Sequence, residues 1–189
     1  MLLDAPRASR SLDLSKYDRG NGGHGIGDVS ADRQMEPSGE AKSGRFSGSA
    51  VIDRPIGEVF EFLAEGTNDP LFSPRVLSIH KESAGPTGVG TVFVSRVKDA
   101  GMKTDRRFEL TEFEPTTTIR WAERSKNLVT ATEGGYDLED LGNSQTRVTV
   151  FNSLAGHGVG KLIVGFAVKA AGKDADAFAH RIKAAVEAS

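Results

Sequence analysis

The longest helical pattern in the chain runs from about residue 159 to 188. At 100° per residue, its larger apolar side chains gather on one broad face, and its lysines and most of its acidic residues lie opposite. The apolar face comprises Ile163, Phe166, Ala167, Ala170, Ala171, Phe178, Ile182 and Ala185. This pattern predicts a long amphipathic helix whose apolar face belongs to the core.

Two features of this segment depart from a plain core stripe. Gly165 and Gly172 lie inside it, although each glycine costs about 1 kcal/mol in a helix relative to alanine. Asp174 and Arg181 fall on the apolar side. Either the helix shifts phase or kinks near Gly172, so that both charges reach solvent, or the helix lines a cavity and both groups lie at its mouth.

Before this helix, the chain alternates between apolar and polar residues in short segments. The first predicted strand covers 46–53, with Phe46, Gly48, Ala50 and Ile52 on one face. Six more strands are predicted at 76–83, 91–98, 103–113, 118–124, 129–138 and 146–152. Their connections are too short for parallel crossovers, so consecutive strands pair antiparallel.

A helical pattern interrupts the strands at 55–65, with Asp53 as the expected N-cap and Gly66 as the expected end. The next residues, 68–74, contain two prolines and cannot form a long helix. Leu71 and Phe72 lie in this segment and require burial. We therefore expect a short helix or turn laid on the sheet.

Residues 1–45 differ from the rest, because they are rich in glycine, serine and charges that cancel, without apolar periodicity. Such a segment cannot bury enough surface to offset its ordering entropy, so we predict a disordered extension, followed by one domain at 46–189. Met35 precedes a short polar lead into the first strand and is an alternative start of the chain.

Composition excludes several classes of protein. The chain has 189 residues, no cysteine and a net charge of −2, which argues against a disulfide framework, a thiolate metal site or a nucleic-acid-binding surface. The four histidines lack metal-ligand spacing, and we expect neither a metal nor a cofactor. No apolar run is long enough for an integral membrane segment, and no signal core begins the chain. We expect a cytoplasmic protein whose oligomeric state the sequence leaves open.

Five short motifs occur in a characteristic order along the chain, at 53–60, 88–93, 108–115, 135–139 and 146–150. Together they resemble the START-like, Bet v 1-type superfamily (SRPBCC) in its polyketide cyclase/dehydrase-like branch. The resemblance covers roughly residues 46 to 185. It implies an α+β helix-grip fold, in which a curved antiparallel seven-stranded sheet grips the C-terminal helix and two short helices follow the first strand. It also implies an apolar cavity between sheet and helix, with Phe72 where relatives often have tryptophan.

The residues expected to line this cavity follow from the alternation of the strands and from the apolar face of the long helix. Simple core packing is the alternative interpretation for each aromatic residue. Tyr136 and Trp121 are the better pocket candidates, because each has a polar group that needs a partner when buried. The expected pocket residues are Phe72, Phe93, Phe108, Leu110, Trp121, Tyr136, Leu138, Asn152 and Phe166.

The catalytic residues stay unknown from the sequence, with three weak candidates. Tyr136 is one. Glu123 is expected at a strand end in water, and would be a general base with a raised pKa only if it were buried. His157 lies in a glycine-rich segment, 156–161, that could gate the cavity and only faintly resembles a phosphate-binding loop.

These observations predict a module that binds a small hydrophobic or amphipathic ligand, such as a lipid, a polyketide or an aromatic metabolite. Whether it is an enzyme is left open. A cyclase, aromatase or dehydratase would need two polar groups that converge in the pocket, and the candidates are Tyr136, Asn152, Glu123, Arg96, Asp174 and Arg181. A third possibility is a co-chaperone, marked by a large exposed apolar patch.

Overall fold

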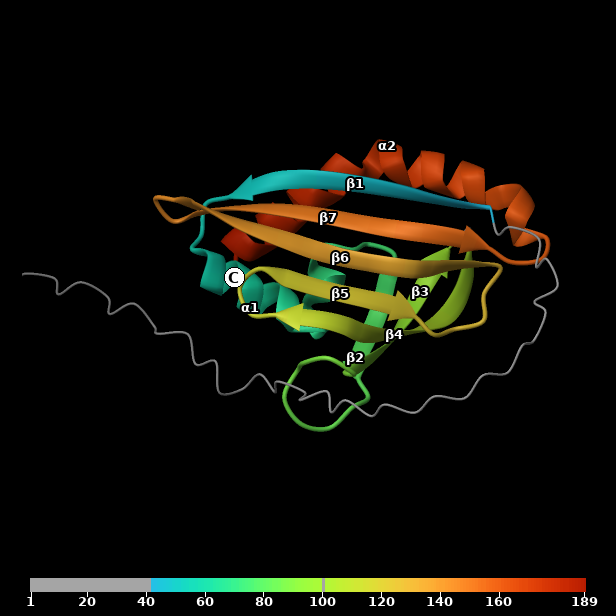
Figure 1. The fold of residues 1–189 in the computed structure, drawn as a ribbon, viewed down its shortest axis with the longest axis horizontal. Helices are drawn as coiled ribbons and strands as arrows, with labels where there is room; N and C mark the ends of the chain where they lie inside the picture. Colours follow the sequence, from blue (N-terminus) through green and yellow to red (C-terminus); the bar gives the residue numbers. More distant parts are fainter. Residues whose placement is uncertain (1–41, 100) are drawn as a thin grey trace, which may run out of the picture.

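The computed structural model describes residues 42–99 and 101–189. One antiparallel sheet of seven strands, in the order β1-β7-β6-β5-β4-β3-β2, curves beside a long C-terminal helix (Figure 1). The strands are β1 Ser43–Ile52, β2 Val76–Lys81, β3 Val92–Asp99, β4 Met102–Glu114, β5 Thr118–Glu123, β6 Val129–Gly142 and β7 Gln145–Gly156. All seven predicted strands are confirmed, and several are longer than the alternation indicated.

The helices occupy the predicted places. α1 (Ile56–Ala64) and the 3₁₀ helix η2 (Gly66–Leu71) follow β1, and α2 (Gly160–Glu187) ends the chain. The α+β helix-grip fold is therefore confirmed. None of the helices within the described residues is long and apolar enough to span a membrane.

The strand register defines which side chains face α2. Gly48 of β1 lies against α2 so closely that a Cβ at this position would stand 2.2 Å from the carbonyl oxygen of Ala175. Directly paired residues of antiparallel strands project to the same side, so the register carries this face from Gly48 to Val150, Tyr136 and across the sheet. We call this side the inner face.

The core lies where α1 and the second half of α2 cover the inner face. Ile52, Val59, Phe60, Val148 and Ile182 are completely or almost completely buried there. The rings of Phe60 and Phe113 meet edge to face with centroids 5.2 Å apart, which adds a directional aromatic contact to the apolar packing.

The predicted core face of α2 is wrong in its first half. Phe166 is 78% exposed and Ile163 is 50% exposed. The buried positions are Gly160, Val164, Ala175, Ala179, Ile182 and Val186. Small side chains let the helix lie close to the glycines of β1, and this contact turns the larger apolar residues outward. A helix wheel ranks positions by hydrophobicity alone, so it does not show where a close contact with another element requires small side chains.

Two smaller expectations also fail, and a third point is decided in part. Asp53 does not cap α1, whose N-cap is Pro55, because the Asp53 carboxylate accepts hydrogen bonds from Lys183 and Gln145. Leu71 is exposed, and only Phe72 of that pair is buried. α2 continues through Gly172, and Asp174 beyond it reaches solvent with a side chain that is 60% exposed, as one of the two alternatives expected. The expectations on residues 1–45 and on Met35 fall almost entirely outside the described residues.

Candidate functional site

The inner face is not covered evenly. α2 packs mainly against β1 and β7, with few contacts to β6, and η2 covers β2. Trp121, near the end of β5, points inward by register but is only half-buried, and Phe108 and Asn152 beside it are half-buried as well. An inward side chain keeps solvent access only where its cover is incomplete, so the inner face around Trp121, which packs against the core, is only partly covered.

The walls of this open region are apolar. Phe93, Leu110, Tyr136 and Leu138 lie buried on the inner face, as their alternation predicted. Phe72 closes one end, with its ring 5.8 Å from that of Phe178 in α2. The register thus gathers eight of the nine expected pocket residues on or beside one surface, while their contact with a ligand stays a prediction.

Trp121 and Tyr136 form the centre of this surface. Their rings meet edge to face with centroids 4.9 Å apart. Gly134 lies beneath them, and a Cβ at this position would stand 2.3 Å from both Trp121 Nε1 and Asn152 Oδ1. Glycine is therefore required here so that an indole N–H and an amide can sit side by side on the inner face.

Asp69, in η2, supplies a carboxylate to the same region. Asp69 is half-buried, and desolvation by the surrounding protein is the one cause that raises the pKa of its carboxyl from 3.8 to about 7. Asp69 can therefore hold or release a proton near neutral pH.

Asp69 acts on Tyr136. Burial raises the pKa of the Tyr136 phenol well above its usual value, and the negative charge of Asp69 raises it further. A neutral phenol and a carboxylate of adjustable charge thus lie close enough for the charge of Asp69 to affect the pKa of Tyr136.

The sequence analysis placed Glu123 in water, and this expectation is wrong. Glu123 is buried on the inner face with no exposed side-chain surface. Its carboxylate accepts hydrogen bonds from Arg106 Nη1 at 2.8 Å, Asn127 Nδ2 at 2.6 Å and the backbone N–H of Ala131 at 2.9 Å. Arg106, on neighbouring β4, makes this burial possible. Because its oxygens are satisfied, Glu123 fastens the connection from β5 to β6 and is a weak candidate for a general base.

His157 lies outside this region. It is exposed and pairs with the Thr130 hydroxyl through Nε2 at 2.7 Å. Both residues line a surface pocket of about 740 Å³ at the β5–β6 connection, together with Glu123 and Asn127. Gly156 and Gly160 serve close packing, since a Cβ on Gly160 would stand 1.8 Å from the Leu128 carbonyl oxygen, whereas Gly158 has open space around it and a φ of +53°.

Several expected residues are not brought into the site. Phe166 points into solvent. Arg96 is exposed and makes a bidentate pair with Asp105. Asp174 and Arg181 pair with each other at 2.7 Å, and Arg181 also donates to the Phe72 carbonyl oxygen. The pairing explains how two charges sit beside the apolar face of α2.

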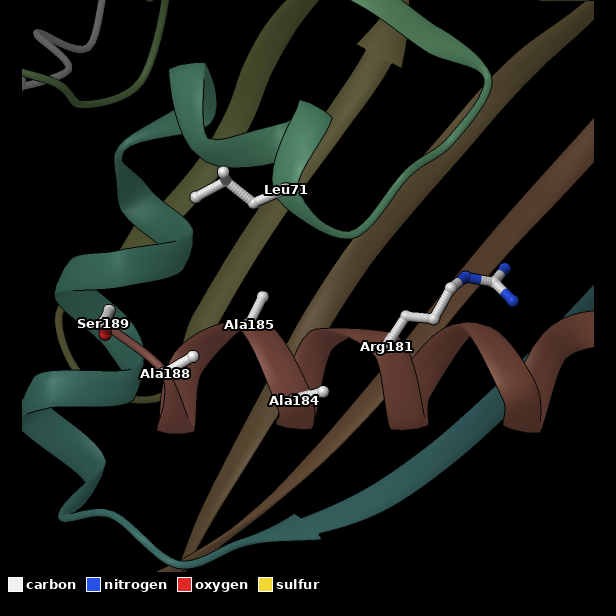
Figure 2. A pocket seen from close by; sticks show the side chains of 6 residues that line it. All are labelled: Leu71, Arg181, Ala184, Ala185, Ala188 and Ser189. Carbon is white, nitrogen blue, oxygen red and sulfur yellow. The ribbon is translucent and has the colours of Figure 1, made fainter.

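A second pocket, of about 440 Å³, lies between η2 and the end of α2. Figure 2 shows the Leu71 side chain above Ala185, with the Arg181 guanidinium directed away from it. Leu71 and Ala184 are exposed here, so this hollow opens on the surface. No group of three potential metal ligands occurs within the described residues.

Sequence reasoning missed Asp69. The residue stands in Asn-Asp-Pro, which is typical of a solvent-exposed turn, and no local pattern distinguishes a carboxylate that faces inward. The one available signal was its place next to Leu71 and Phe72, in a segment expected to lie on the sheet.

Comparisons with known proteins agree with the geometry. The family described as "Polyketide cyclase / dehydrase and lipid transport" matches residues 43–187. A search of curated protein sequences found no match. Among solved structures, the Zhui aromatase/cyclase from Streptomyces sp. R1128 superposes with a TM-score of 0.63 at 15% identity, covering 77% of this chain and 94% of that one.

Two further solved structures share the fold. A START superfamily protein from Mycobacterium smegmatis gives a TM-score of 0.63 at 12% identity, with 76% of this chain and 97% of that chain covered. A norcoclaurine synthase from Thalictrum flavum gives 0.60 at 9% identity, with 80% and 98% covered. At such identities the similarity establishes the fold.

Proposed function

The chain belongs to the polyketide cyclase/dehydrase and lipid transport family, and we propose that it binds a small hydrophobic or amphipathic molecule on the open part of its inner face. The observation that carries this proposal is the half-buried Trp121, which points inward where α2 leaves the sheet uncovered. A lipid, a polyketide or an aromatic metabolite would cover Trp121 and Phe108 and thereby remove apolar surface from water.

The polar groups of the region support an amphipathic rather than a purely hydrocarbon ligand. The Trp121 N–H and the Asn152 amide lie side by side over Gly134, and the Asp69 carboxylate is electrostatically coupled to the Tyr136 phenol. A few polar groups placed in an apolar pocket usually fix the orientation of a ligand that carries its own hydroxyl or carbonyl groups.

Native mass spectrometry of the full chain tests the proposal. We expect a bound species that denaturation releases and that solvent extraction identifies. Asn152→Phe would fill the open region and should remove that species, whereas Thr149→Phe adds the same bulk on the opposite face of β7 and should retain it. A full chain without any bound species, and without affinity for amphipathic probes, would contradict the proposal.

A second candidate function is acid–base catalysis in the same region, as in a cyclase, aromatase or dehydratase. Asp69 favours it, because a carboxylate that titrates near pH 7 beside a neutral phenol can move a proton at working pH. Asp69 and Tyr136 would be the two converging groups, in place of the dispersed candidates from the sequence.

Turnover of an aromatic polyketide surrogate tests this candidate. We expect kcat to depend on pH with a midpoint near 7 and to fall at least roughly a hundredfold in both Asp69→Asn and Tyr136→Phe, while the ligand remains bound. Undiminished turnover in both variants would exclude this pair from the chemistry, and binding without turnover would leave ligand binding as the function.

A further inference from the structure

The first half of α2 exposes large apolar side chains on the side away from the sheet. Leu162 is 82% exposed and Phe166 is 78% exposed, one helical turn apart on the same face. In Figure 1 this half of α2 runs along the edge of the molecule beside β1. We name as the α2 apolar patch the residues Leu128, Val159, Leu162, Ile163 and Phe166, each at least half exposed.

The patch is continuous across two segments. The β5–β6 connection touches the start of α2, where the His157 N–H donates to the Leu128 carbonyl oxygen at 2.8 Å. The same carbonyl lies against Gly160. Leu128 is thus fixed beside the first turn of α2, and the patch forms one end of the molecule instead of a row of scattered side chains. A patch of this kind marks an interaction site.

Within the first half of α2 the charges are of one sign. Between His157 and Lys173 the sequence has Lys161, Lys169 and Lys173 and neither aspartate nor glutamate. Phe166 lies at the border between the apolar and polar faces predicted from the sequence, so Lys169 and Lys173 project on the same side as Leu162 and Phe166; both lysines are exposed. Lys126 is exposed on the β5–β6 connection next to Leu128.

Apolar side chains framed by lysines fit an anionic lipid surface, where the rings and branched chains enter the headgroup boundary and the ammonium groups meet lipid phosphates and carboxylates. We propose that the α2 apolar patch docks this protein on anionic membranes. A second copy of the chain is the weaker occupant, because two patches facing each other would bring lysines of both copies together.

Co-sedimentation of the full chain with lipid vesicles tests the inference. We expect binding to vesicles of phosphatidylcholine and phosphatidylserine in equal parts, and weaker binding to phosphatidylcholine alone or at high salt. Leu162→Ser with Phe166→Ser should lower the partition coefficient about tenfold or more. Lys169→Gln with Lys173→Gln should lower it about tenfold, and only on anionic vesicles.

The matched control is Leu77→Ser with Val89→Ser, which removes two exposed apolar side chains from β2 and the loop after it. This variant should bind vesicles like the unaltered chain. Circular dichroism verifies that each variant is folded.

Fluorescence quenching gives a second readout of the same docking. The unaltered chain has a single tryptophan, Trp121, which lies on the inner face and away from the patch. Phe166→Trp adds an indole within the patch itself. Vesicles of brominated lipid should therefore quench the emission of the Phe166→Trp variant more strongly than that of the unaltered chain, and equal quenching of both would contradict insertion of the patch.

Absence of binding to anionic vesicles would overturn the inference, as would equal binding by the Leu162→Ser, Phe166→Ser variant. A dimer that the same substitutions dissociate would assign the patch to a second copy instead. Membrane docking and ligand binding are separable, because the patch variants should retain the bound species in native mass spectra while Asn152→Phe should lose it and still sediment with vesicles.

Discussion

Folding changes the acidity of the Asp69 carboxyl group. Burial raises its pKa, so the folded protein holds the Asp69 proton up to about pH 7, whereas an unfolded chain releases it near 3.8. Between these values the folded state binds more protons than the unfolded state, so the free energy of unfolding must fall as pH rises. The lost stability returns when the pH is lowered again.

We predict that the unaltered chain loses about 2 kcal/mol of unfolding free energy between about pH 5 and pH 8 on account of Asp69. Asp69→Asn should remove most of this loss, because the amide stays neutral at both pH values. Urea denaturation at the two pH values measures the difference. A pH dependence that is the same in Asp69→Asn would show that the carboxyl is not held protonated.

Glu123 gives a second prediction at this scale. Glu123→Ala would remove the acceptor of the buried Ala131 N–H and the carboxylate that pairs with Arg106, so we expect a loss of about 3 kcal/mol in the free energy of unfolding. The control is Glu112→Ala, on exposed β4 surface, where the change should stay within about 0.5 kcal/mol. Equal effects in urea denaturation would contradict the role assigned to Glu123.

At the scale of elements, the contact of α2 with β1 decides where the helix lies. Gly44 faces Val168 and Gly48 faces Ala175, each too close for a Cβ without displacement of its neighbour. The helix end is fastened separately, because Lys183 bridges Asp53 at 2.9 Å and Glu187 at 2.6 Å. Small residues thus determine how closely α2 approaches β1, and polar residues fix the C-terminal end of α2 in place.

Two glycine substitutions should therefore have opposite effects. Gly48→Ala would push α2 off β1, and we expect a loss of about 1–3 kcal/mol in unfolding free energy. Gly165→Ala, on the open side of α2 with no neighbouring atom within 4 Å, should gain about 0.5–1 kcal/mol from helix propensity. Denaturation midpoints measure both, and a gain from Gly48→Ala would refute the close contact.

At the scale of the whole molecule, the sheet is covered at one end and open at the other. α1, Phe72 and the second half of α2 pack the core, while the inner face near Trp121 is only partly covered. A ligand there would complete the core. We predict that the ligand-depleted chain melts at a lower temperature than the chain as purified, by an amount that grows with ligand concentration.

Differential scanning calorimetry before and after extraction measures this shift. Returning the extracted ligand should restore the melting temperature, and Asn152→Phe should show no shift at all. Identical melting curves for depleted and loaded protein would mean that the ligand does not bind to the folded state in preference to the unfolded one.

The sequence by itself determined the order of elements, the face of each strand and the family. Alternation with period two depends only on neighbouring residues, so it assigns Phe93, Leu110, Tyr136 and Leu138 to the inner face without knowledge of the fold. The five motifs can likewise be recognised from the sequence alone, because each consists of a few consecutive residues.

The tertiary structure alone decided which groups meet across the sheet and which face of α2 is buried. The helix wheel assigns Phe166 to the core because it shows hydrophobicity but not the glycines of β1 that admit only small residues. Burial raises the pKa of Asp69, and Glu123 is held in place by a partner, Arg106, that is distant in sequence. Burial and pairing depend on neighbours in space, and these neighbours exist only once the chain has folded.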